Sequence, residues 1–314
     1  MQFAVEAWAN EYGAPIEDSE VLATPQNPPL LDIEMAVEDW RPITKPGPAA
    51  RADRVAFTDG VRRVDARVWI ADGPHTRLGL CASYAAGVVR ATAAVGAEPA
   101  RAVVSSCEVE RGMFTCAPGA EPVRSRHATF EVRLVDSDDP DRLSLALQQR
   151  MGELEVALVA QAGPADLVVV DGPLRGRQHV PHAIGYVKTH HVAYLPAIVE
   201  GIVASLVPGE RTPLFVTTAS WSRYSWYVRL PGRPGHPWAG VVRCEAPADL
   251  STIEAVHLAE LSAATVGHFA SSPHKDPRAP QNLYPIAGLE RALRHRLGDA
   301  PLIYRSLRAA AAQP

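Results

Sequence analysis

Two acidic residues stand at the ends of apolar segments that are typical of buried strands. Asp59 follows Val55 to Thr58, and Asp171 follows Leu167 to Val170 further along the chain. Carboxylate oxygens are the ligands that Mg²⁺ and Mn²⁺ prefer. If the two strands are neighbours, the acids predict a divalent-metal site of the kind that supports phosphodiester hydrolysis. Taken alone, each Asp-Gly pair is also typical of a tight turn.

A helix between these strands can supply a third carboxylate. Asp138 to Pro140 predicts the start of a helix that continues to about Gln161. Its apolar stripe consists of Leu147, Met151, Leu154 and Leu158. At about 100° per residue, Glu155 lies about 70° and Glu153 about 130° from the centre of that stripe. The rotation favours Glu155, whereas the antiparallel return of the helix brings its start toward Asp171 and favours Glu153. We prefer Glu155.

Two further segments carry residues suited to nucleic acid. Lys188 follows the second acid closely and can neutralise a scissile phosphate, although a solvated surface lysine explains it as well. A predicted strand near residues 220–230 places four large side chains on one face: Trp221, Arg223, Tyr227 and Arg229. That face resembles a stacking platform for single-stranded nucleic acid, and an amphipathic edge strand is the alternative.

A late basic helix offers a fourth carboxylate. The Pro-rich segment from His274 leads into a helix that carries Glu290 among several arginines. If this helix packs back on the domain, Glu290 can act as a metal ligand. Pairing of Glu290 with the neighbouring arginines is the alternative.

Composition is that of an ordinary globular protein, with 47% hydrophobic and 21% charged residues. No apolar run reaches the ~20 residues of a membrane helix, and the first residues are acidic rather than typical of a signal peptide. The four cysteines have no zinc-site spacing. We therefore expect a cytoplasmic, non-membrane protein with reduced thiols.

Charge and turn signals divide the chain near residue 48. The first 50 residues hold two basic and nine acidic side chains, and the remainder holds 29 basic and 26 acidic ones. We expect an acidic arm over residues 1–48, which includes a helix at Ile33 to Trp40, and one domain over residues 49–314. Phe3, Trp8, Ile33 and Trp40 are too few to form a core, so the arm should pack on the body or on a second subunit.

The order of the elements predicts the fold. Four strands are expected before the helix: Val55 to Asp59, Arg62 to Ala71, Leu78 to Arg90 and Ala102 to Val109. After the helix, the strand that ends at Asp171 should lie beside the first strand. This is a ribonuclease H-like arrangement, in which Asp59 and Asp171 end adjacent strands. We therefore expect an α/β fold: a ribonuclease H-like mixed sheet flanked by helices, with an N-terminal helical arm.

Several short motifs resemble the NurA family of DNA nucleases. They are Phe-Thr-Asp-Gly-Val-Arg-Arg (57–63), the helix with its glutamate, Val-Val-Asp-Gly-Pro-Leu (169–174), Gly-Tyr-Val-Lys-Thr (185–189) and Asn-Leu-Tyr-Pro (282–285). The resemblance covers about residues 50–310. It implies a ribonuclease H-like homodimer that cuts DNA with manganese or magnesium and works with a hexameric HerA-like ATPase in end resection.

The resemblance also implies roles for individual residues. Asp59, a helical glutamate and Asp171 match the acidic metal ligands of the family, whereas Glu290 stands where the family pattern has a histidine after its Tyr-Pro. Glutamate can also ligate a divalent cation. The catalytic residues expected are Asp59, Glu155, Asp171 and Lys188, with Glu290 as a further metal ligand. The DNA contacts expected are Arg62, Arg63, Arg175, Lys188, Trp221, Arg223 and Tyr284.

The leading hypothesis is a divalent-metal-dependent deoxyribonuclease, an exonuclease or single-strand endonuclease that acts with a HerA-like ATPase in DNA end processing or repair. A catalytically silent adaptor that guides DNA to a motor ATPase is the alternative, and the intact carboxylates argue against it. A sugar-kinase or actin-like phosphotransferase shares the strand-Asp-Gly start. It also requires a second ribonuclease H-like half with its own phosphate loop, which the sequence does not contain.

Overall fold

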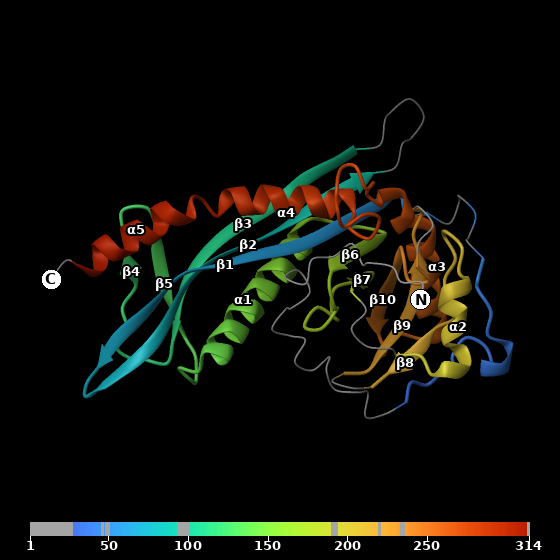
Figure 1. Cartoon of the computed structure of the whole chain (residues 1–314), viewed down its shortest axis with the longest axis horizontal. Helices are drawn as coiled ribbons and strands as arrows, with labels where there is room; N and C mark the ends of the chain where they lie inside the picture. Colours follow the sequence, from blue (N-terminus) through green and yellow to red (C-terminus); the bar gives the residue numbers. More distant parts are fainter. Residues whose placement is uncertain are drawn as a thin grey trace, which may run out of the picture. The chain divides into compact units, whose positions relative to one another are not determined.

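The computed structural model of the chain describes residues 28–44, 47, 51–92, 101–189, 194–218, 221–232 and 236–312. The strands in these segments are β1 Arg54–Asp72, β2 His75–Thr92, β3 Arg101–Thr115, β4 Val123–Arg124, β5 Thr129–Leu134, β6 Leu167–Asp171, β7 Ala183–Val187, β8 Phe215–Thr217, β9 Arg223–Arg229 and β10 Val241–Pro247. The helices are η3 Val37–Asp39, α1 Pro140–Gln161, α2 Ala197–Ser205, α3 Thr252–Thr265, η5 Val266–Phe269, α4 Tyr284–Arg296 and α5 Ala300–Ala311. Together they form an α/β fold with helices flanking one large mixed sheet (Figure 1). The ten strands described follow the order β4-β5-β3-β2-β1-β6-β7-β10-β9-β8.

The chain divides into two compact units. The first comprises Met1–Thr58, Val89–Val103 and Gly163–Ala287. In it β6 pairs in parallel with β1 and β7, whereas β10 pairs antiparallel with β7 and β9, and β8 with β9. The Leu-Val-Val-Val run of β6 is buried throughout, as expected for a strand covered on both faces. Trp226 of β9 donates to Ser262 Oγ of α3 at 3.1 Å, and this bond ties the helix to the sheet.

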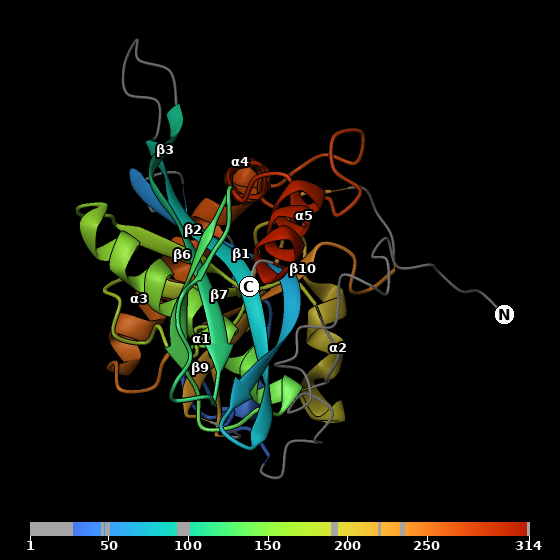
Figure 2. The same ribbon diagram turned by 90° about the vertical axis from the view of Figure 1, so that its left-hand side faces the viewer.

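The second unit comprises Asp59–Val88, Val104–Ala162 and Gly288–Pro314. The long strands β1, β2 and β3 run side by side in it (Figure 2). The Asp139 side chain caps α1 by accepting from the amides of Asp141 and Arg142 at 2.8 and 3.3 Å, and such a cap typically stabilises a helix by about 1 kcal/mol. A core cluster that includes Met113, Phe130, Ile303 and Leu307 holds α5 against the strands.

The sequence predicted several elements correctly. The helix expected from Pro140 to Gln161 is α1, and its apolar stripe is buried. The strand expected before Asp171 is β6, and it lies beside the first strand, with Thr58 paired to Val170 at the end of the register. The mixed sheet flanked by helices is confirmed at this level of detail.

Two predictions about the elements were wrong. The strands expected at Val55 to Asp59 and Arg62 to Ala71 are one continuous strand, β1. The helix expected at Ile33 to Trp40 is reduced to the three-residue 3-10 helix η3, whose N-terminus has no side-chain cap. Without a cap, so short a segment cannot offset the cost of helix nucleation.

The described part of the arm belongs to the first unit and packs on the later segments of that unit. Leu30 forms a β-bridge with Val216, and Ile43 forms one with Arg211. Glu34 pairs with Arg211 at 2.7 Å and so gives a counter-charge to an arginine side chain that is 1% exposed. The packing predicted for the arm is confirmed for these residues, while Phe3 and Trp8 lie outside the described residues.

Candidate active site

Asp59 lies inside β1 rather than at a turn. The Gly60 amide donates to Asp59 Oδ1 at 2.8 Å, and the strand continues to Asp72. Glycine follows the acid because α1 crosses the strand closely at this point. A Cβ on residue 60 would lie 2.5 Å from Glu155 Oε1 and 2.9 Å from Met151 Sδ, closer than atoms can approach. The structure therefore brings Glu155 to the strand position next to Asp59.

The two candidate glutamates of α1 lie on different sides of the helix. Glu155 is 2% exposed, whereas the Glu153 side chain is 65% exposed and pairs with Arg150 at 2.9 Å. The rotation inferred from the apolar stripe is confirmed. The antiparallel return of the helix, which favoured Glu153, does not place the Glu153 side chain in the interior.

If the protein is the deoxyribonuclease expected from the sequence, Glu155→Gln should remove metal-dependent DNA cleavage and Glu153→Gln should retain most of it. The reason is geometric: only Glu155 lies against β1 beside Asp59. The rate of cleavage of labelled DNA measures both variants, and circular dichroism confirms that each is folded. Loss of cleavage in Glu153→Gln alone would contradict the assignment.

Asp171 and Lys188 form an ion pair at the ends of β6 and β7. The distance from Lys188 Nζ to Asp171 Oδ2 is 2.7 Å. Lys188 also donates to Asn282 Oδ1 at 3.1 Å, and Asn282 Nδ2 donates to Asp276 Oδ2 at 2.6 Å. An ammonium only donates and a carboxylate only accepts, so the Asn282 amide has a single orientation here. The four side chains Asp171, Lys188, Asn282 and Asp276 form one hydrogen-bonded network, here called the Asp171–Asp276 network.

The other carboxylate oxygen of Asp171 has no hydrogen-bond partner in the described part of the chain. Oδ1 is buried, and only Oδ2 is used by Lys188. A buried polar atom without a partner typically costs about 1–3 kcal/mol. Such atoms are uncommon in folded proteins, and an ordered water, a ligand or an ion can satisfy them.

Asp276 lies at the end of the Asp171–Asp276 network opposite Asp171. Burial alone would raise the pKa of this carboxyl, but the hydrogen bonds from Asn282 and the Arg278 amide, together with the Arg278 charge, hold the pKa below its usual value. Asp276 therefore stays ionised and fixes the Asn282 amide. Because Asn282 is 0% exposed, Lys188 meets a rigid acceptor.

The loop after Asp171 is held in place by close backbone packing. Gly172, at a φ of 92°, exchanges two backbone hydrogen bonds of 2.9 Å with Tyr186. Gly185 leaves room for the loop, since a Cβ there would lie 2.7 Å from the Leu174 amide nitrogen. That amide donates to Glu245 Oε2 at 3.2 Å. The position of Asp171 thus depends on β7 and β10 as well as on its own strand.

Glu245 is the centre of a buried ion cluster. It is 1% exposed, and its Oε1 accepts from Arg223 Nε and Arg243 Nη2, both at 2.9 Å. Burial alone would lower the pKa of Arg243, but the Glu245 carboxylate outweighs it and raises that pKa. Both arginines also lie over the Tyr194 ring, at 5.8 Å for Arg223 and 4.3 Å for Arg243.

The open stacking face predicted for β9 is wrong. Both faces of the strand are buried, and Arg223 is used by Glu245. Tyr227 is 0% exposed and stacks on Phe215 at 5.8 Å between ring centroids. The alternation of residue types along this segment is the same for an edge strand and for a strand that pairs with both β8 and β10, so it could not distinguish the two. A DNA contact by Trp221 stays a prediction.

The other residues expected to bind DNA have varied surroundings. Arg62 donates to Gln148 Oε1, and Arg63 pairs with Asp65 at 2.8 Å. Both arginines are therefore committed at least in part to contacts within the second unit. Arg175 is exposed in the loop after β6.

Glu290 and Tyr284 lie on α4. Glu290 accepts from Arg294 at 2.9 Å, which is the neighbouring ion pair considered as the alternative to metal ligation. Tyr284 is 41% exposed, its hydroxyl lies 2.7 Å from Ser272 Oγ, and Lys275 Nζ lies 5.5 Å from its ring centroid. A metal role for Glu290 stays a prediction.

Sequence reasoning missed Asn282, Asp276 and Glu245 as residues that support the site. Asn282 stood in a motif, but nothing in the sequence linked it to Lys188, 94 residues away. Glu245 lies inside the buried strand β10, and an acid within such a segment was the available signal.

In the described ranges, no three His, Cys, Asp or Glu side chains are grouped so as to hold a metal ion as they stand. None of the described helices is long and apolar enough to cross a membrane. Comparison with protein-family models and with curated proteins found no match for this chain.

Proposed function

We propose that the protein is a divalent-metal-dependent DNA nuclease with a ribonuclease H-like fold. The observation that carries the proposal is the Asp171 carboxylate, whose Oδ1 is buried without a partner while Oδ2 meets Lys188. A hard divalent cation is the ligand that such an oxygen suits. Asp59 and Glu155 are the further carboxylates proposed to ligate the ion, although the described side chains do not form such a group as they stand. Manganese or magnesium would suit such oxygen ligands.

The strand order supports this proposal. The central strands follow the order β3-β2-β1-β6-β7, with β1, β6 and β7 parallel. The register of β1 and β6 ends at Thr58 and Val170, and the next residue of each strand is an acid, Asp59 or Asp171. The helix α1 precedes β6 in the sequence and carries Glu155, and in a ribonuclease H-like arrangement the helix before the second strand can add a glutamate.

Each residue has a definable task in phosphodiester hydrolysis. A bound divalent ion supplies a nucleophilic water at neutral pH and stabilises the leaving oxygen. Lys188 contributes a positive charge beside Asp171, where it can meet a phosphate oxygen, and Asn282 keeps its ammonium in position. Glu155, which is 2% exposed, is shielded from bulk water and therefore interacts strongly with charge.

The test is a cleavage assay with purified protein and end-labelled single- and double-stranded DNA. We expect products with Mn²⁺ or Mg²⁺ and none with chelator. Binding of DNA without cleavage under every metal condition would contradict the nuclease and favour the alternative, a silent adaptor that guides DNA to a motor ATPase. A HerA-like hexameric ATPase is the proposed partner in DNA end processing.

We further expect a homodimer in which the N-terminal arm contributes to the subunit or ATPase contact. A chain starting at Pro28 retains Leu30 and Glu34 with their partners Val216 and Arg211, so it removes the early arm without exposing a buried guanidinium. Light scattering should give a dimer for the full chain and a weaker dimer for the truncated chain. A monomeric full chain, or unchanged assembly and ATPase binding after truncation, would contradict the arm's role.

A further inference from the structure

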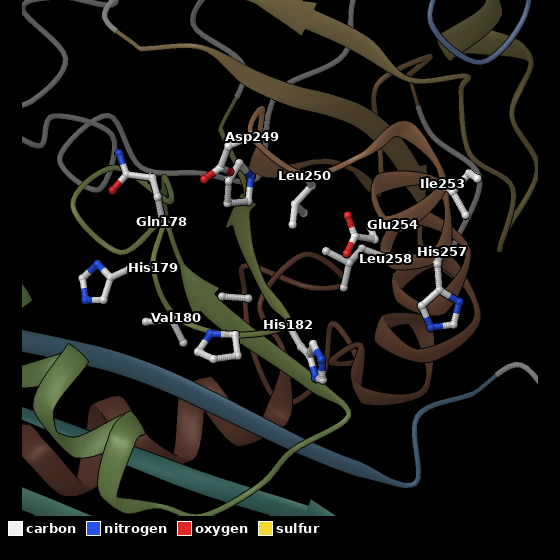
Figure 3. A pocket seen from close by; sticks show the side chains of 13 residues that line it. Gln178, His179, Val180, His182, Asp249, Leu250, Ile253, Glu254, His257 and Leu258 are labelled. Atoms are coloured by element: carbon white, nitrogen blue, oxygen red, sulfur yellow. The ribbon is translucent and has the colours of Figure 1, made fainter.

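A cavity of about 610 Å³ opens in the first unit near the start of β7 (Figure 3). Its walls come from the loop before β7, from Pro247 at the end of β10 and from the first turns of α3. Glu254 and His257 lie on the α3 side, across from Val180 and His182 (Figure 3). The volume is within the range of small-molecule sites.

The cavity is separate from Asp171. It adjoins Ala183, the first residue of β7, which pairs with Val168. Asp171 pairs with Tyr186, three residues further along the same ladder. At about 3.3 Å per residue, the two pairs are roughly 10 Å apart along the strands. A ligand here would not use the residues proposed for DNA cleavage.

The charged residues that line the cavity are both acids. Asp249 has no hydrogen bond or ion pair in the described ranges, and no Lys or Arg is among the lining residues. Glu254 accepts from the hydroxyl and the amide of Ser251 at 2.7 and 2.8 Å in the capping box of α3. These bonds hold the pKa of Glu254 below its usual value, so its negative charge persists at neutral pH.

His182 adds a further acceptor. Its Nδ1 lies 3.1 Å from the Ala165 carbonyl oxygen, and because a carbonyl can only accept, Nδ1 carries the hydrogen. In the neutral ring, Nε2 is then an acceptor. The residue has a φ of 56°, the left-handed region, and its carbonyl accepts from Val168. Histidine is among the residues that adopt this region most readily after glycine, asparagine and aspartate.

We propose that this cavity binds a small organic cation, an amine carried on an apolar body. The ammonium group would donate to Asp249, Glu254 or His182. The body would lie against the apolar lining, which includes Val180 and Leu250. An anion would face two carboxylates without an opposing lysine or arginine. The proposal is independent of the nuclease activity.

Three indole compounds with the same apolar body test the charge preference at pH 7. They are tryptamine, a cation, tryptophol, which is neutral, and indole-3-propionate, an anion. We expect calorimetry to rank their affinities in that order, with tryptamine about fivefold tighter than tryptophol, as an exposed ion pair allows. Equal affinities, a preference for the anion, or no tryptamine binding would overturn the proposal.

Two variants locate the site. Asp249→Asn should weaken the binding of tryptamine about fivefold and leave the binding of tryptophol unchanged. Glu200→Gln makes the same charge change on α2, outside the cavity, and should alter the affinity for neither compound. Leu250→Trp should fill the cavity and weaken the binding of both compounds. Unchanged thermal unfolding is the check that this variant is folded. Tryptamine binding that is unaffected by Asp249→Asn or by Leu250→Trp would overturn the assignment.

Discussion

Asp171→Asn is expected to abolish metal-dependent DNA cleavage while the protein stays folded. The variant keeps the volume of the side chain but removes the charge that a divalent cation requires. Lys188 retains Asn282 as an acceptor, so its ammonium is not left without a partner. We expect a loss of at least two orders of magnitude in the cleavage rate, the scale of single catalytic groups. Asp59→Asn should behave in the same way.

The matched control is Asp166→Asn, which alters an acid just before β6. Asp166 pairs with Arg54 at 2.6 Å, and the two side chains are 32% and 50% exposed. Cleavage should therefore persist in this variant with nearly unchanged stability. Full activity in Asp59→Asn or Asp171→Asn, measured with chelated and metal-loaded protein, would remove the basis for the proposed site.

Glu245→Gln should cause the largest loss of stability among single substitutions considered for this chain. The carboxylate is the shared partner of Arg223 and Arg243, and glutamine would leave two buried guanidinium groups without a counter-charge. Removing one partner from a buried ion cluster typically costs about 3–5 kcal/mol. Urea unfolding followed by circular dichroism measures the free energy of unfolding.

Glu153→Gln provides the comparison for this prediction. Its ion pair with Arg150 spans one helical turn, and the Glu153 side chain is 65% exposed. Its loss should cost no more than about 0.5 kcal/mol. A loss below about 1 kcal/mol for Glu245→Gln would mean that water or a rearranged side chain replaces the carboxylate.

The sequence predicted the elements whose signals are local. Asp139 and Pro140 marked the start of α1, and the heptad-like spacing of its leucines fixed which side of the helix is buried. The apolar run of β6 marked a strand covered on both faces. Glu155 was preferred over Glu153 on the same basis. Such patterns are reliable because they follow from helix and strand geometry alone.

The remaining features depend on contacts between distant segments. Asp59 and Gly60 carry the composition of a turn, yet the glycine serves the close approach of α1, which the sequence does not disclose. The pairing of Lys188 with Asn282 depends on how the Pro-rich segment before α4 folds against β7. Arg223 looked like a surface residue because its partner Glu245 lies on another strand.

The glycines that follow the two acids differ in their tolerance of substitution. At position 172 the backbone φ is 92° and a Cβ would meet nothing within 4 Å, so asparagine, which adopts left-handed conformations most readily among the other residues, should be partly accepted. At position 60 the obstacle is the α1 side chains Glu155 and Met151, which would have to shift to admit any larger residue. In a saturation library selected for folded protein, two identical Asp-Gly dipeptides would therefore leave different residue profiles. The Asp-Gly sequence therefore reflects a packing constraint within β1 and a constraint on backbone conformation after β6.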